Sequence, residues 1–135
     1  MSTKSLSRAF GVALALCFAF GAAVHAADAA PPKPSGKWIL YFDSWSDNDG
    51  DLVLRIAPDQ GQPLEVATKI PKGTHENEAA ELVAGSLKGQ LGGGYSVKVE
   101  DGEKVYIKNK GKTPKFVVSQ ASSSVTGLKL KIKRS

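Results

Sequence analysis

From residue 37 to residue 70 the chain alternates between apolar and polar positions, which is the pattern of β-strands with one buried face. Two turn segments rich in Asp, Gly and Pro interrupt this pattern, at 43–51 and 58–63. Because the connections are short, we expect three consecutive antiparallel strands. Their inward-facing residues are expected to be Trp38, Leu40 and Phe42, then Leu52, Leu54 and Ile56, then Leu64, Val66, Thr68 and Ile70.

After residue 71 the apolar spacing changes to three and four, which predicts one helix. Thr74 is the expected N-cap, two glutamates follow it in the first turn, and the triple glycine at 92–94 predicts the end of the helix. Gly85 and Gly89 lower the helix propensity, and we expect them to mark a face close to the sheet. The buried stripe is expected to contain Ala79, Val83, Leu87 and Leu91, flanked by Ala80 and Leu82.

Residues 95–107 predict a β-hairpin in which the loop length decides which side chains share a face. A two-residue loop would divide the apolar residues between both faces. A three-residue loop at 100–102 pairs Val97 with Val105, keeps the apolar residues together and places Gly102 at a left-handed position. We therefore expect the three-residue loop.

Two more alternating segments follow the hairpin, and they complete the predicted fold. The first contains Phe116 and Val118 and precedes a polar loop at 120–124; the second runs from Leu128 to Ile132. The predicted order is β-β-β-α-β-β-β-β. Because the strands cluster in sequence around one helix, we expect an α+β fold with a single helix packed on a mainly antiparallel sheet.

The amino-terminal residues have the three parts of a secretory signal peptide. Lys4 and Arg8 precede an apolar run at 9–23, and Val24-His25-Ala26 ends in small residues. The run is about 15 residues long, shorter than the roughly 20 that cross a bilayer, so a cleaved signal is favoured over an uncleaved anchor. We expect a signal peptide at 1–26, a Pro/Ala-rich leader at 27–35, a single small domain at 36–135, and a periplasmic or secreted protein without a transmembrane segment after cleavage.

Signal removal changes what the composition implies. The chain has 135 residues, 18 Lys+Arg, 13 Asp+Glu, one cysteine and a net charge of +5. Without residues 1–26 it has 109 residues, a net charge of +3, no cysteine, and His75 as its one histidine. That composition excludes disulfides and thiolate metal sites, and a Ser-His-Asp triad would have to use His75. We expect no catalysis at His75, because its neighbour Thr74 is better explained as the helix N-cap than as a nucleophile. We therefore expect one domain that is not an enzyme and has no cofactor.

The acidic turn at 43–51 is one candidate binding site. An EF-hand loop with Gly50 at its sixth position would need an acidic residue at Trp45 and a bidentate glutamate at Ile56, so this signature fails at both ends. A looser calcium site and a solvated turn remain as alternatives. The candidate ligands are Asp43, Asp47, Asp49 and Asp51.

Lysines occupy the outward positions of the later strands and form the second candidate site. If these strands are neighbours, the lysines make one basic sheet face that can bind a polyanion such as nucleic acid, anionic lipid or an acidic envelope polymer. The alternative is that they keep the domain soluble and its edges unpaired. The candidates are Lys98, Lys104, Tyr106, Lys108, Lys129, Lys131 and Lys133, together with Arg134 and the turn residues Lys110, Lys112 and Lys115.

Three aromatic residues surround the first strand. Trp38 alternates with apolar neighbours, which predicts a core position. Tyr41 and Trp45 either pack within the domain or form an exposed contact for a sugar or a protein.

The segment 74–118 has the pattern T-x-E-x-E-A-A-x-L-V-A-x-x-L, a glycine break, Y-x-V-x-V, a short turn, V-Y-I and F-V-V. It resembles a helix-plus-hairpin module of phage tail and bacterial surface proteins. The resemblance implies a role in assembly or adhesion rather than catalysis. We therefore expect an exported, non-catalytic binding or envelope-assembly domain; a calcium-binding module and a purely structural protein are the alternatives.

Overall fold

The computed structural model describes residues 32–135, so the expected signal peptide and most of the leader lie outside the described part. Within it, three strands precede one helix and four strands follow, which confirms the predicted α+β class and element order. The elements are β1 Lys37–Asp43, β2 Gly50–Pro58, β3 Leu64–Ile70, α1 Glu76–Leu91, the short 3-10 helix η2 Gly92–Gly94, β4 Tyr95–Glu100, β5 Lys104–Asn109, β6 Phe116–Ser123 and β7 Lys129–Arg134.

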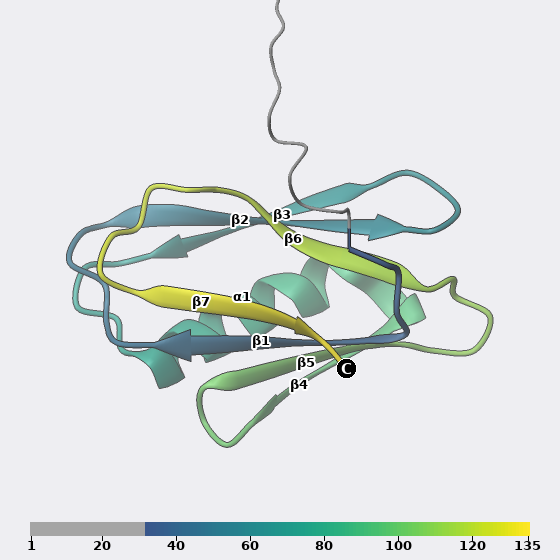
Figure 1. Cartoon of the computed structure of the whole chain (residues 1–135). Helices are drawn as coiled ribbons and strands as arrows, with labels where there is room; N and C mark the ends of the chain where they lie inside the picture. Colours follow the sequence, from purple (N-terminus) through teal and green to yellow (C-terminus); the bar gives the residue numbers. More distant parts are fainter. Residues whose placement is uncertain (1–31) are drawn as a thin grey trace, which may run out of the picture. The chain divides into compact units, whose positions relative to one another are not determined.

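The strands form two antiparallel sheets, which corrects the expected single sheet. One sheet has the order β4-β5-β1-β7 and the other β3-β2-β6, as Figure 1 shows. The chain changes sheets directly after β1, where Ser44 has a φ of 72°, a left-handed conformation that turns the backbone. β1 therefore does not pair with β2, and its neighbours are β5 and β7 from later in the chain.

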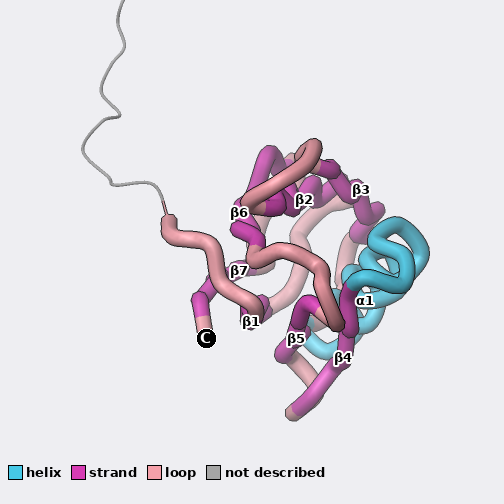
Figure 2. The backbone as a smooth tube through the Cα atoms, turned by 90° about the vertical axis from the view of Figure 1, so that its right-hand side faces the viewer, coloured by secondary structure: helices cyan, strands magenta, loops and turns pink. Residues whose placement is uncertain are grey.

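The inner faces of both sheets and one face of α1 enclose a single core. α1 contacts β3 and β4, the outer strands of the two sheets on that side, whereas β6 and β7 end the sheets on the side away from the helix (Figure 2). The core confirms the predicted inward residues except Leu64 and Leu82, which are exposed, and Leu91, which is only partly buried. Its largest fully buried side chains include Phe42, Phe116, Leu40, Leu54, Ile56, Ile70 and Leu87.

The β4–β5 hairpin keeps the predicted faces but not the predicted register. Val97 pairs with Ile107, and the three-residue loop is 101–103 rather than 100–102. Both registers bury the same side chains because they differ by an even number of positions. The observed one places Glu100 opposite Lys104, and Asp101 adopts the left-handed conformation beside Gly102.

The start and the exposed face of α1 also differ from expectation. His75, not Thr74, is the N-cap, because the Thr74 hydroxyl donates to the Pro71 carbonyl oxygen at 2.6 Å. Gly85 and Gly89 do not face a sheet, since a Cβ at either would have no neighbour within 4 Å. No helix among residues 32–135 is long and apolar enough to cross a membrane.

Both ends of the folded part lie beside the β6 and β7 edges. Ser35 pairs with Phe116 at the beginning of β6, and the Ser35 hydroxyl donates to the Ser135 carbonyl oxygen at 3.0 Å. β6 itself continues through Ser123, so the segment expected as a polar loop is mostly strand. Its exposed serines pair with β2 through backbone hydrogen bonds. Because this pairing involves no apolar side chains, the hydrophobic pattern of the sequence does not indicate a strand here.

Candidate polyanion-binding face

The outer face of the β4-β5-β1-β7 sheet gathers all seven basic and aromatic residues predicted for the polyanion site. Cross-strand partners have their side chains on the same side of a sheet. Lys98, Tyr106, Ile39 and Lys133 form one such row, and Lys104, Tyr41 and Lys131 lie in the next. We call this surface the lysine face; it consists of Lys37, Ile39, Tyr41, Asp43, Ser96, Lys98, Glu100, Lys104, Tyr106, Lys108, Lys129, Lys131 and Lys133.

β1 contributes residues to this face that are not among the candidates predicted from the sequence. Lys37, Ile39 and Tyr41 alternate with the buried residues of β1, and that alternation was the available signal. The sequence does not show that β1 lies between β5 and β7, so it does not show that these residues fill the middle of the face. Arg134, in contrast, is the partner of Trp38 and therefore belongs to the opposite side of β7.

Tyrosine rings lie between the lysines at the centre of the lysine face. The Nζ atom of Lys37 is 4.9 Å from the centre of the Tyr106 ring, and that of Lys104 is 5.9 Å from the centre of the Tyr41 ring. Both distances are within the range of cation–π attraction. Lysine stems thus cover part of the aromatic surface while their ammonium groups reach solvent.

The cations of the lysine face are largely without acidic partners. The lysine face contains seven lysines, counting Lys37 of β1. Within residues 32–135, Lys104 is the only one of the seven that forms an ion pair, with Asp101 at 3.1 Å. That hydrogen bond raises the pKa of Lys104 above its ordinary value. Lys37 and Lys108 are directly opposite each other on β1 and β5, an arrangement of like charges that costs stability. An anion bound between them would relieve this repulsion.

Two open hollows on the lysine face meet at Tyr106. The larger, of about 530 Å³, has four lysines and one carboxylate in its lining: Lys37, Lys98, Lys108, Lys110 and Glu100. The second, of about 430 Å³, is lined by Tyr41, Lys104, Lys131 and Lys133. Each hollow therefore combines several ammonium groups with a phenol ring, a combination that suits an anionic group carried on a ring-shaped unit.

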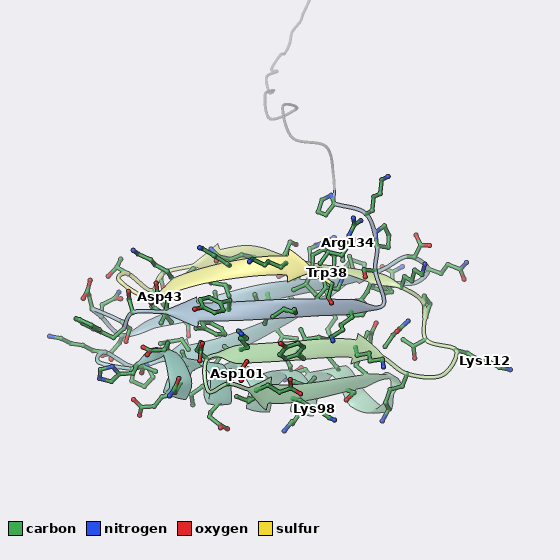
Figure 3. The ribbon with its side chains drawn as sticks, turned by 60° about the horizontal axis from the view of Figure 1, so that its bottom comes forward. Trp38, Asp43, Lys98, Asp101, Lys112 and Arg134 are labelled. Atoms are coloured by element: carbon green, nitrogen blue, oxygen red, sulfur yellow. The ribbon has the colours of Figure 1, made fainter. Side chains whose placement is uncertain are left out.

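The charge on the lysine face is not uniform along the strands. Asp43 and Asp101 lie at one end of the sheet, and Arg134 and Lys112 lie toward the other (Figure 3). Asp43 is the partner of Lys129, and Glu100 is the partner of Lys104. The basic surface is consequently strongest around Lys37, Lys108 and Lys133, away from the acidic end.

The four aspartates proposed as calcium ligands have separate roles. The Asp49 carboxylate accepts a 2.8 Å hydrogen bond from the Lys72 backbone N–H, Asp51 pairs with Lys69 across the sheet, and Asp43 is a β1 residue. The Asp47 backbone N–H donates to the Thr126 carbonyl oxygen at 2.8 Å, which ties this residue to the β6–β7 loop. Among the residues that the structure describes, no group of three or more His, Cys, Asp or Glu side chains is placed to hold a metal ion. Calcium binding at the acidic turn thus has no ligand cluster to support it.

The predicted aromatic contact site is divided between two places. Trp38 is buried as expected, and Tyr41 belongs to the lysine face. Trp45 is 55 % exposed in the β1–β2 loop, with its ring centre 5.9 Å from that of His75. Trp45 and His75 form an isolated bridge that joins this loop to the start of α1, which gives both residues a structural role.

Two sequence comparisons with known proteins found no relative of this chain. No protein-family model matches the chain, and no curated protein is significantly similar to it. Any functional assignment therefore depends on the residues of the chain itself.

Proposed function

We propose that this protein is an exported, non-catalytic binding domain that contacts an anionic polymer through the lysine face. The observation that carries the proposal is the gathering of seven lysines from four strands on one side of a sheet, six of them without an ion-pair partner in residues 32–135. A surface that only needs solubility mixes both signs of charge. Here one sign dominates.

The strand geometry supports a linear ligand. Alternate residues of a strand repeat about every 7 Å, so Lys129, Lys131 and Lys133 present a regular row of positive charges. Lysine ammonium groups act as mobile point charges that attract sulfate, phosphate or carboxylate without strict geometry. Tyr41 and Tyr106 supply apolar surface for the rings of a polymer between these charges.

Retention of the full chain on a heparin column tests the proposal, with heparin as the polyanion. We expect the wild-type protein to be retained at low salt and released as the salt concentration rises, because released counterions make such binding salt-dependent. The triple variant Lys129→Glu/Lys131→Glu/Lys133→Glu should elute at clearly lower salt.

A matched variant separates the lysine face from net charge. Lys69, Lys72 and Lys88 are exposed residues of β3, the following turn and α1, and none belongs to the lysine face. Their replacement by glutamate changes the net charge by the same amount. This control variant should elute at a salt concentration closer to that of the wild type than the β7 triple variant does. Equal shifts for the two triple variants, or no retention of the wild type, would contradict the proposal.

A further inference from the structure

β7 ends its sheet with a free hydrogen-bonding edge. The Ser135 N–H donates to the Lys37 carbonyl oxygen at 3.0 Å, so the odd-numbered residues of this segment bond to β1. In an antiparallel pair, every second residue directs its N–H and C=O groups toward the partner strand, and the residues between them direct these groups to the opposite side. The backbone groups of Leu130, Ile132 and Arg134 therefore point away from β1. No strand within residues 32–135 pairs with this edge.

A groove with both apolar and polar lining residues follows the inner side of the β7 edge. Leu130 and Ile132 pack against the core but are only half-buried, because β6 and β7 do not pair with each other on the side opposite α1. A hollow of about 200 Å³ opens between these two strands. Its lining combines two polar residues of β6 with five apolar residues: Gln120 and Ser123, and Phe42, Leu52, Val125, Leu128 and Leu130.

The outer side of the same edge is basic. Lys129, Lys131 and Lys133 are exposed and alternate with the half-buried leucine and isoleucine. A second copy of this chain pairing β7 with β7 would bring lysines opposite lysines, which is unfavourable. The charge of the edge thus disfavours self-association and suits a strand of opposite charge.

We propose that β7 binds, by strand addition, an extended partner segment in which acidic residues alternate with apolar residues. The partner backbone would bond to the free groups of Leu130 and Ile132. Its apolar side chains would cover the groove between β6 and β7, and its carboxylates would lie beside Lys129, Lys131 and Lys133. The proposal goes beyond polyanion contact, because it requires backbone hydrogen bonds and a fixed side-chain alternation.

A short synthetic peptide in which glutamate alternates with valine provides the probe. We expect it to bind the full chain and to slow amide hydrogen exchange at Leu130 and Ile132, the two central free-edge N–H groups. A peptide of the same composition with its glutamates and valines in separate blocks should bind at least about tenfold more weakly, because it cannot satisfy both sides of the edge at once. Equal binding of both peptides would overturn the proposal.

Two variants of β7 and one control sharpen the test. Ile132→Pro removes an N–H that points away from β1, so the β1–β7 pairing can persist while peptide binding is lost. Lys131→Glu should weaken peptide binding without any change to the backbone. Lys98→Glu/Lys108→Glu alters the lysine face far from the edge and should leave peptide affinity within about twofold of the wild type.

The outcomes distinguish strand addition from polyanion binding. Loss of peptide binding in Ile132→Pro with unchanged heparin retention supports the edge proposal. Binding of polyglutamate as tightly as the alternating peptide, with no slowing of exchange at Leu130 and Ile132, overturns strand addition and leaves polyanion binding in place. Strand addition of a partner segment is also overturned if amide exchange at Leu130 and Ile132 slows with rising protein concentration in the absence of peptide. A second copy of the chain would then occupy the edge.

Discussion

The indole Nε1 of Trp38 donates a buried 2.7 Å hydrogen bond to the carbonyl oxygen of Phe116. Trp38 belongs to β1 and Phe116 to β6, so this bond joins the two sheets inside the core. The same carbonyl oxygen accepts from the Ser35 N–H at 2.9 Å, so the segment that enters the domain meets both sheets here.

Loss of this bond should weaken the contact between the sheets. Trp38→Phe keeps an aromatic ring but removes the N–H, and we expect the free energy of unfolding to fall by about 1–3 kcal/mol. Urea denaturation measures the change. Trp45→Phe is the control, because Trp45 is exposed and its replacement should change stability by less than about 0.5 kcal/mol. Similar losses in both variants would argue against a special role for the Trp38 bond.

Gly85 is a helical glycine that nothing in its surroundings requires. A Cβ at this position meets no atom within 4 Å, and φ is in the ordinary range. Gly85→Ala should therefore raise the free energy of unfolding by about 0.5–1 kcal/mol, through a smaller entropy loss on folding. Thermal denaturation measures it.

Gly127→Ala is the contrasting case. Gly127 has a φ of 87°, and its added Cβ would come within 2.6 Å of the Trp45 carbonyl oxygen. We expect clear destabilisation here. A stabilised Gly127→Ala variant, or a destabilised Gly85→Ala variant, would contradict this account of the two positions.

Ser46 fixes the β1–β2 loop to the start of α1. Its buried hydroxyl donates to the Pro71 carbonyl oxygen at 2.6 Å and accepts from the Thr74 N–H at 2.9 Å. Ser46→Ala removes the close acceptor of the Thr74 N–H, whereas the Pro71 carbonyl oxygen keeps its 2.6 Å hydrogen bond from the Thr74 hydroxyl. We expect the free energy of unfolding to fall by about 1–3 kcal/mol. Ser124→Ala removes an exposed hydroxyl and should have a smaller effect in the same urea titration. A neutral Ser46→Ala variant would contradict the prediction.

Tyr95 should make stability fall at alkaline pH. Burial raises the pKa of its phenol above the ordinary value of 10.0, and its ring packs edge-on against Phe116 at 5.0 Å. Because the folded state prefers the protonated phenol, this contribution is complete below pH 10.0 and is lost as the pH rises through the folded pKa. Tyr95→Phe should lose less stability than the wild type between neutral and alkaline pH. A constant difference between the two proteins across that range would contradict the prediction.

Hydrophobic alternation predicted the presence of each strand and of the helix and the inward face of most core residues, but not the full length of β6 or the exposure of Leu64 and Leu82. It was not sufficient for strand partners. In β1, Leu40 is buried in the same way whether its neighbours are β2 and β3 or β5 and β7, so the pattern does not distinguish one sheet from two. The hairpin shows the same limit, because pairing Val97 with Val105 or with Ile107 leaves the same side chains inside.

The lysine face could be predicted only in part for the same reason. Alternation placed Lys98, Lys104 and Lys131 outward without the structure, since a strand residue next to a buried one must face away. The central position of Tyr41 and Lys37 depends on β1 lying between β5 and β7, which joins segments far apart in the chain. Only the fold brings them together.

The contact between Ser35 and Ser135 also makes the domain a candidate for circular permutation, because it places the beginning and the end of the folded part side by side. A short linker between these two residues would close the domain into a ring, because the Ser35 hydroxyl already reaches the Ser135 carbonyl oxygen. New ends can then be opened in the exposed segment 59–63 between β2 and β3. Such a circular permutant would retain every strand pair, the helix and the lysine face, while its ends would leave from a different side of the molecule.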